Sequence, residues 1–198
     1  MLMKDNNVPD WYIDSCKKIK YMFPKAHAAA YVTNAFRIAW FKVHEPKAYY
    51  TAYFTIRADE FDSDIMCHGE ERVKNKMKEI DLLGNGATVK EKNMYAILEL
   101  VLEMYERGIN FLPMDLYKSH STKFVMEEDG IRPPLNSIPG LGTVAAEGIE
   151  KAKKDGKFMC IDDLQQRSGV GKSVIEMLKN AGCLKGMTQS NQMSFFEF

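Results

Sequence analysis

The sequence predicts a mainly α-helical fold: a helical N-terminal segment with a small β-hairpin, then a tandem helix-hairpin-helix domain and a flexible C-terminal tail. Three observations support this prediction. Apolar residues recur at helical spacing over much of the chain, two short β-rich segments lie near the middle, and two glycine-containing turns precede apolar helices near the end. The chain has 198 residues, 45% of them hydrophobic, enough for one large or two small domains with a core.

Two helices are expected in the first 44 residues and a third directly after them. A short amphipathic helix is predicted within residues 10–21. Residues 25–44 follow Pro24, are apolar on nearly every face, and are predicted to form a buried helix that Pro46 ends. A tyrosine-rich apolar helix is expected over residues 47–57.

Two further helices are expected before residue 108. Residues 69–83 are typical of an exposed, charged helix that ends at the turn Gly84-Asn85-Gly86. Thr88, with Glu91 three residues later, forms a capping box for the next helix. The apolar residues of that helix trace one face as far as Gly108.

The sequence of the middle of the chain predicts strands and a linker. Residues 111–117 and 122–126 are expected to be short strands, followed by a turn at Asp129-Gly130. Pro133-Pro134 is interpreted as a linker between domains. We therefore predict three parts, residues 1–132, residues 133–186 and residues 187–198.

The composition excludes several classes of protein. The net charge is zero, so no overall field draws the chain to nucleic acid or membrane, and any DNA contact must be local. Residues 1–50 are the basic part, with eight Lys or Arg against four Asp or Glu. The four cysteines are too far apart for a zinc motif and are interpreted as reduced thiols. With no membrane-length apolar run and no recognisable signal peptide, we expect a cytoplasmic protein without membrane contact.

The segment Ile138-Pro139-Gly140-Leu141-Gly142 precedes a helix of small residues and is interpreted as a helix-hairpin-helix turn. Its glycines let the backbone approach a phosphate, which the N–H groups at the start of the next helix can bind. Such contacts do not depend on base sequence. The alternative is an ordinary glycine-rich turn between helices.

About thirty residues later, Gly169-Val170-Gly171-Lys172-Ser173 precedes another apolar helix and predicts a second hairpin. Two hairpins in tandem typically hold both strands of a duplex across the minor groove. A phosphate-binding Walker loop is excluded, because Gln166 stands where that loop needs glycine and no strand leads into it. The candidate DNA-binding residues are Gly140, Leu141, Gly142, Thr143, Gly169, Gly171 and Lys172.

Lys25, His27 and Tyr31 form a second candidate site, at the start of the predicted buried helix. The i, i+4 spacing puts both rings on one face, where a cation and two stackable rings could bind a nucleotide. The alternative is that the two rings are hydrogen-bonded core residues.

No catalytic or metal-binding residues are predicted in this chain. Asp59, Asp62 and Asp64 resemble the paired carboxylates that hold magnesium, but no rigid strand presents them to a cleft. Cys67-His68 lacks further ligands nearby, and no nucleophile is spaced to pair with a base.

The segment Gln192-Met193-Ser194-Phe195-Phe196 has the form of a short peptide ligand. Two adjacent aromatic rings can fill an apolar groove, while the glutamine amide fixes the register at its rim. It resembles the peptides that bind bacterial sliding clamps, with apolar substitutes for two leucines. The alternative is a frayed C-terminal tail.

Together these segments resemble the C-terminal end of the PolC-type bacterial DNA polymerase III α subunit. The block Pro24-Lys25-Ala26-His27-Ala28-Ala29-Ala30-Tyr31 is the most specific part of this resemblance, which covers nearly the whole chain. The other segments that carry it are Trp11-Tyr12-Ile13, residues 17–23, Asp115-Leu116-Tyr117, Ile138–Gly142, Asp163–Arg167 and the tail.

The resemblance implies that residues 1 to about 130 belong to the fingers, that the hairpins bind duplex DNA, and that the tail docks on the β sliding clamp. It also implies that Lys25, His27 and Tyr31 lie near the incoming dNTP. The palm with its catalytic aspartates and Mg²⁺ would lie in the remaining domains, so no cofactor and no polymerisation are expected of this chain alone. The alternative function is a stand-alone DNA-binding adaptor that docks on the clamp without polymerase activity.

Overall fold

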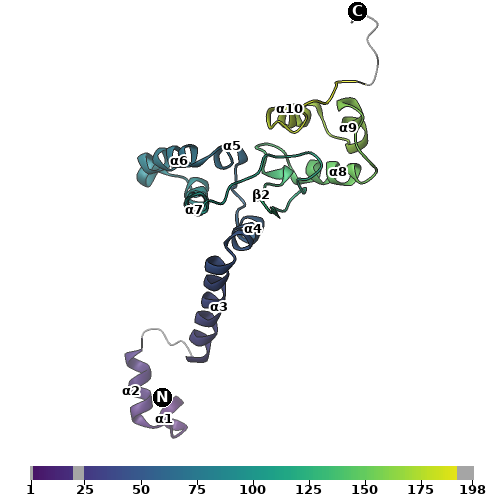
Figure 1. The fold of residues 1–198 in the computed structure, drawn as a ribbon. Helices are drawn as coiled ribbons and strands as arrows, with labels where there is room; N and C mark the ends of the chain where they lie inside the picture. The colour runs from purple at the N-terminus through teal and green to yellow at the C-terminus, as the bar shows by residue number, and fades with distance from the viewer. Residues whose placement is uncertain (1, 20–24, 191–198) are drawn as a thin grey trace, which may run out of the picture. The chain divides into compact units, whose positions relative to one another are not determined.

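The computed structural model describes residues 2–19 and 25–190, and Figure 1 shows that these residues are mainly α-helical, as predicted. By compactness the chain divides into residues 1–44 and residues 45–198. We predicted domain boundaries at residues 132 and 186. The division by compactness does not test them, so they stay a prediction. In the described part of the chain, no helix is both long enough and apolar enough to cross a membrane.

Within residues 2–19 and 25–44, the first unit contains three helices, α1 (Leu2–Asp5), α2 (Asp10–Lys18) and α3 (Lys25–His44). The helix over residues 25–44 is confirmed, but our prediction that it is buried is wrong. None of its residues is buried, and its large apolar side chains are exposed, including Phe36 at 72% and Trp40 at 52%. An apolar pattern states what a helix prefers to contact, whereas burial also requires a surface that covers it.

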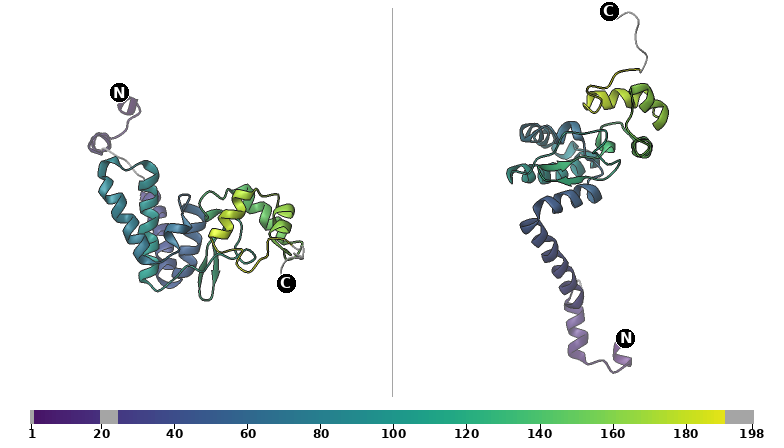
Figure 2. Two further views of the ribbon diagram at one scale, coloured as in Figure 1. Left: turned by 90° about the horizontal axis from the view of Figure 1, so that it is seen from above. Right: turned by 45° about the vertical axis from the view of Figure 1, so that its right-hand side comes forward.

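The second unit begins with α4 (Pro46–Arg57), α5 (Ser63–Met66) and α6 (Glu70–Leu83). After the 3₁₀ turn η1 (Gly84–Gly86), helix α7 (Val89–Glu106) lies beside α6, as Figure 2 shows. The capping box of α7 is confirmed, because the Thr88 side chain accepts from the Glu91 N–H while the Glu91 carboxylate accepts from the Thr88 N–H. These elements surround a first hydrophobic core. Its buried residues are Tyr50, Phe54, Ala58, Met66, Val73, Ile80, Met94, Ile97, Leu98, Val101, Met104, Phe111, Phe124 and Ile131.

The predicted β-hairpin is present, but its strands differ from those expected. Strand β1 (Val125–Glu127) pairs antiparallel with β2 (Gly130–Arg132) across the turn that we predicted. The strand expected over residues 111–117 is wrong, because only Phe111 forms an isolated bridge there. Arg132 is nearly buried and holds this hairpin by donating to the Glu127 carboxylate and to the Pro113 carbonyl.

The rest of the second unit contains the 3₁₀ turn η2 (Leu135–Ser137) and the helices α8 (Thr143–Lys153), α9 (Ile161–Ser168) and α10 (Lys172–Asn180). These elements surround a second hydrophobic core. Its buried residues are Leu116, Leu135, Ile138, Leu141, Ala146, Ile149, Ala152, Phe158, Ile161, Leu164, Val170, Ile175, Leu178 and Leu184.

The loop before the β-hairpin is fastened to α8. Lys153 donates to the Ser119 carbonyl at 2.7 Å, and the Ser121 N–H donates to the Glu150 carboxylate at 2.8 Å. Burial alone would raise the pKa of Glu150, but its contacts with Lys153 and Ser121 hold that pKa below its usual value. The carboxylate therefore stays ionised at neutral pH and keeps both bonds.

Candidate nucleic-acid interface

Two turns of the second unit share one local design. Hairpin 1 (residues 138–142) leads into α8, and hairpin 2 (residues 169–171) leads into α10. Each contains a glycine at positive φ, Gly140 at +84° and Gly169 at +70°, a conformation that other residues rarely adopt. A buried apolar residue and a second glycine follow in both turns. The sequence prediction of two related hairpins is thus matched by their backbone geometry.

The second glycine of each hairpin is the N-cap of the following helix. Gly142 has φ −70° and Gly171 has φ −76°, and neither supplies a side-chain acceptor to the first turn. The N–H groups at the start of α8 and α10 therefore have no side-chain cap, and the helix dipole adds partial positive charge there. Both helix ends can accept a phosphate oxygen.

The backbone conformation at these two N-cap positions does not require glycine. Their φ values are ordinary for any residue. A methyl group at Gly142 would meet nothing within 4 Å, and one at Gly171 would meet only Ser173 Oγ, at 3.9 Å. Space in front of an uncapped helix end is suited to a ligand that approaches the backbone closely.

The hairpins are held together by close packing. A Cβ at Gly140 would lie 2.8 Å from Met177 Cε of α10, and a Cβ at Gly148 of α8 would lie 2.8 Å from the Ser168 carbonyl oxygen. Hairpin 1 thus packs on the helix that hairpin 2 begins. The two helix ends form parts of one rigid unit.

Arg167 links two helices of this unit, a role that the sequence did not reveal. Its guanidinium donates to the carbonyls of Ala152 and Gly156 at the end of α8 and lies 4.6 Å from the centroid of the Phe158 ring. Arg167 is therefore committed to joining α9 to α8. By contrast, Lys172 is exposed at the start of α10 and takes part in no ion pair found among the described residues.

One feature that the sequence did not reveal is the apolar side chain beside hairpin 1. Val144 is 84% exposed, one residue after the start of α8. An exposed valine next to a candidate phosphate site can contact the apolar edge of a sugar. The only signal in the sequence was its place two residues after the hairpin glycine.

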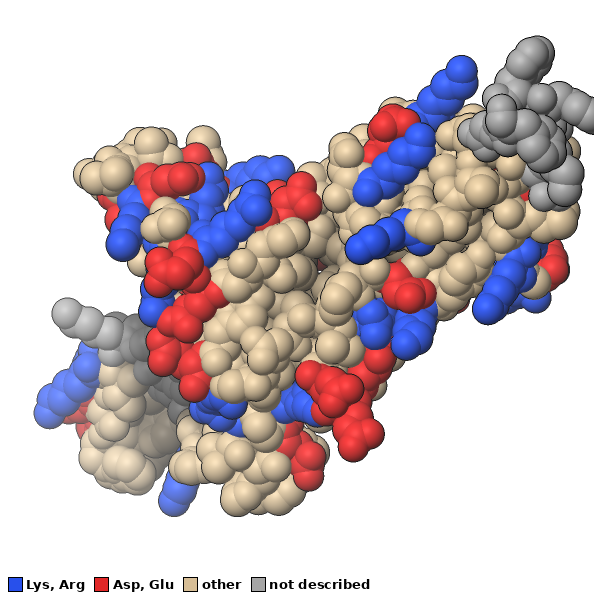
Figure 3. All heavy atoms as spheres, turned by 45° about the horizontal axis from the view of Figure 1, so that its top comes forward, with Lys and Arg blue, Asp and Glu red and all other residues tan. Residues whose placement is uncertain are grey.

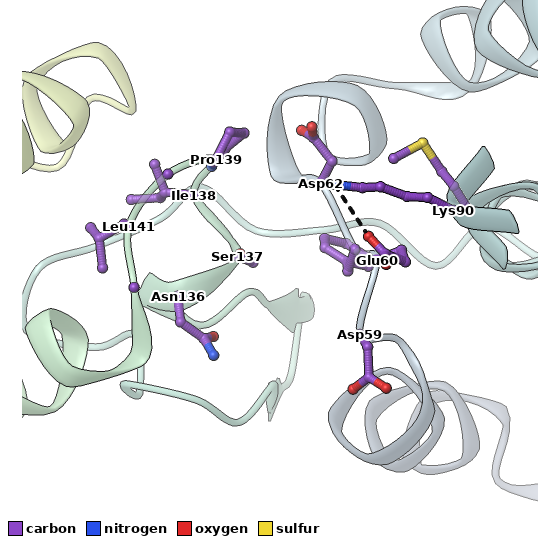
Figure 4. Close-up of a pocket in the computed structure, with 13 residues that line it drawn as sticks. Asp59, Glu60, Asp62, Lys90, Asn136, Ser137, Ile138, Pro139 and Leu141 are labelled. Atoms are coloured by element: carbon purple, nitrogen blue, oxygen red, sulfur yellow. Dashed lines mark ion pairs between the residues drawn. The ribbon is translucent and has the colours of Figure 1, made fainter. Parts of the chain in front are cut away.

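Hairpin 1 borders a pocket of about 390 Å³ whose other wall is acidic (Figure 4). Asp59, Glu60 and Asp62 lie there with Lys90. Glu60 and Lys90 form an ion pair at 3.5 Å, and Asp62 caps α5 by accepting from the N–H groups of Asp64 and Ile65. Three acidic residues and one lysine thus line the wall of the pocket opposite this hairpin.

Hairpin 2 has a different setting. The surface beside Gly169 and Val170 is formed by Asp162, Gln165 and Gln166. Its single carboxylate, Asp162, accepts a hydrogen bond from the Gln189 amide at 2.9 Å. Because the Gln165 and Gln166 amides are neutral and the nearby Lys172 is cationic, the surroundings of hairpin 2 are less negative than those of hairpin 1.

Figure 3 shows basic and acidic side chains intermingled on one face of the molecule, with no broad basic surface on that face. This distribution agrees with the zero net charge. Any contact with DNA on that face must therefore depend on local groups.

The three candidate nucleotide-binding residues lie on α3, and two of them, His27 and Tyr31, are in contact. The rings of His27 and Tyr31 lie 4.4 Å apart between centroids, at an interplanar angle of 53°. Tyr31 is 67% exposed, so the alternative of a core tyrosine is wrong. Lys25 is also exposed, at the first position of α3. Both rings and the lysine are thus exposed on this helix.

The remaining candidates divide into two groups. The peptide Gln192-Met193-Ser194-Phe195-Phe196 lies outside the described residues.

Within residues 2–19 and 25–190, no group of three or more His, Cys, Asp or Glu side chains is placed to hold a metal ion. Burial raises the pKa of the Cys67 thiol, so it remains protonated and is a poor metal ligand.

Comparison with known proteins gives two findings. A family model described as a helix-hairpin-helix motif matches residues 108–193. The chain is also similar to three proteins named DNA polymerase III PolC-type: 60% identical over 195 residues to that of Clostridium perfringens, and 55% identical over 194 residues to those of Caldanaerobacter subterraneus and Bacillus subtilis. Each match covers 98% of this chain but only 14% of the relative's length.

Proposed function

We propose, for a chain that is homologous over nearly its whole length to a segment of PolC-type DNA polymerase III, that it holds duplex DNA in a replicative polymerase. The holding would be done by hairpins 1 and 2, which would bind one phosphate backbone each. The names of the relatives favour this function over that of a stand-alone adaptor. Polymerisation itself would be a property of the longer protein.

The observation that carries this proposal is the pair of uncapped helix ends. Each has a glycine N-cap at ordinary φ, where an added Cβ would meet no atom closer than 3.9 Å, and close packing joins them in one unit. Backbone N–H groups bind phosphate whatever the base, so a protein that holds them rigidly can follow a duplex of any sequence. A replicative polymerase needs this property.

Two further roles belong to the same proposal. Lys25, His27 and Tyr31 would position the incoming dNTP, with the ammonium on phosphate and a ring against the base. The contact between the His27 and Tyr31 rings on α3 supports this role. The peptide over residues 192–196 would tether the polymerase to the β sliding clamp, on the strength of its sequence alone.

Mg²⁺ would assist catalysis in the palm of the complete polymerase, not in this chain. There, metal ions would stabilise the charge that develops as the primer 3′-hydroxyl displaces pyrophosphate from the α-phosphate. The residues described here would contribute positioning.

Binding of the 198-residue chain to labelled duplexes of unrelated sequence tests the proposed DNA contact. We expect affinities that differ little between sequences and that fall steeply as salt rises, because bound phosphates release counterions. A strong sequence preference, or no measurable binding at low salt, would contradict the proposal.

A further inference from the structure

The two hairpins are alike in backbone but different in side chains. When the N-cap glycines are aligned, Lys172 and Ser173 of hairpin 2 correspond to Thr143 and Val144 of hairpin 1. Hairpin 2 therefore presents an ammonium and a hydroxyl group beside its helix end. Hairpin 1 presents a neutral hydroxyl and an exposed isopropyl group.

Hairpin 1 also faces the acidic loop (residues 59–62) across the pocket of Figure 4. Glu60 is partly compensated by Lys90, and Asp62 is engaged as a helix cap. The Asp59 side chain has no hydrogen bond or ion pair found in the described part of the chain, and it is exposed. Its charge remains to repel a phosphate that approaches hairpin 1.

From this asymmetry, and on the premise of the proposed function, we propose that the hairpins hold the two phosphate backbones unequally. Hairpin 2 makes the strong, charge-assisted contact through Lys172 and the N–H groups of α10. Hairpin 1 makes a weaker contact, because it has no cation beside its N–H groups and the acidic loop opposes the phosphate.

An unequal hold has a use in an enzyme that moves along DNA. A duplex gripped equally hard on both strands must release two strong contacts at each step. With one strong contact and one weak contact, hairpin 1 can detach from its phosphate backbone first. Hairpin 2 meanwhile keeps the position of the protein along the DNA. The acidic loop thus lowers the affinity of hairpin 1 for its phosphate backbone.

Lys172→Ala tests the strong contact, with Lys179→Ala as its matched control. Both lysines lie on α10 and both changes remove one positive charge, but Lys179 is at the other end and pairs with Glu176. In the full chain, we expect Lys172→Ala to weaken duplex binding about fivefold near 0.1 M salt and to reduce the log–log salt slope by about 0.9. Lys179→Ala should change affinity less than about twofold at that salt.

Asp59→Asn tests the weak contact, with Asp155→Asn as its control. Both changes remove one negative charge from an exposed residue, but Asp155 follows the end of α8 farthest from hairpin 1. We expect Asp59→Asn to strengthen binding about two- to threefold at low salt, an effect that disappears as salt screens the loop. Asp155→Asn should leave affinity nearly unchanged.

The outcomes separate this inference from the proposed function. If the wild-type chain binds duplex DNA but Lys172→Ala behaves like Lys179→Ala, or Asp59→Asn like Asp155→Asn, the unequal hold is overturned and DNA binding stands. If the wild-type chain does not bind duplex DNA, the proposed function is overturned, and the inference with it.

Discussion

Gly171→Ala should separate DNA binding from folding. The backbone at residue 171 has φ −76°, which alanine adopts freely, and the nearest atom to an added methyl group would be Ser173 Oγ at 3.9 Å. Alanine is a poorer N-cap than glycine, but it also reduces the entropy of the unfolded chain. These effects oppose each other, so the free energy of unfolding should change by less than about 0.5 kcal/mol.

DNA binding should respond differently. The methyl group would stand beside the first N–H groups of α10, where the phosphate is expected. The loss of one charge-assisted hydrogen bond costs about 1.5 kcal/mol or more, which corresponds to roughly a tenfold loss of affinity. Urea unfolding and fluorescence anisotropy of a labelled duplex, on the same protein preparations, measure the two quantities.

Gly86→Ala is the control for this experiment. Its φ is not positive, and an added methyl group would meet nothing within 4 Å. It should therefore preserve both stability and DNA affinity. If Gly171→Ala binds the duplex as tightly as the wild type, hairpin 2 does not use this helix end for phosphate. If Gly171→Ala unfolds the protein, glycine has a structural role that the geometry does not show.

Four further predictions concern the fold and the proposed roles. Gly148→Ala should destabilise the chain by about 1 kcal/mol or more in urea unfolding, although alanine is the better helix former, because its methyl group would lie 2.8 Å from the Ser168 carbonyl oxygen; equal or greater stability would contradict the close packing of α8 on α9. The hydrogen bond from Arg132 lowers the pKa of Glu127 below its usual 4.5, so the pair stabilises the fold fully above that value and less as pH falls through the lowered pKa. Glu127→Gln should flatten the acid-unfolding profile below about pH 4.5, and an unchanged profile would exclude the pair as a source of stability. Replacing Phe195 and Phe196 with alanine should weaken binding to a sliding clamp at least about tenfold, whereas unchanged affinity in a titration would exclude the tether. The chain alone should not extend a primer with Mg²⁺ and nucleotides, and robust extension would show that it contains catalytic carboxylates.

Local signals in the sequence predicted much of the fold. The capping box of Thr88 and Glu91 is present because its two hydrogen bonds involve residues only three apart. Both hairpins were recognised because the order glycine, apolar residue, glycine recurs before a helix, and the first glycine of each has a positive φ. The resemblance to PolC-type polymerases is confirmed by the identities with the three relatives.

Features that depend on distant parts of the chain could not be predicted. The exposure of α3 is one example, since its apolar pattern does not tell which surface covers it. The acidic loop is another, because Asp59 lies more than seventy residues before hairpin 1 in the sequence and shares a pocket with it only after folding. The hydrogen bonds of Arg167 to the end of α8 are likewise set by tertiary packing.

Whether the starts of α8 and α10 bind the phosphate backbone can be measured directly by following backbone amides in NMR spectra as duplex DNA is added. We expect the largest shift changes at residues 142–145 and 171–174, for duplexes of any sequence. Shift changes that avoid both segments while the DNA binds elsewhere would contradict it.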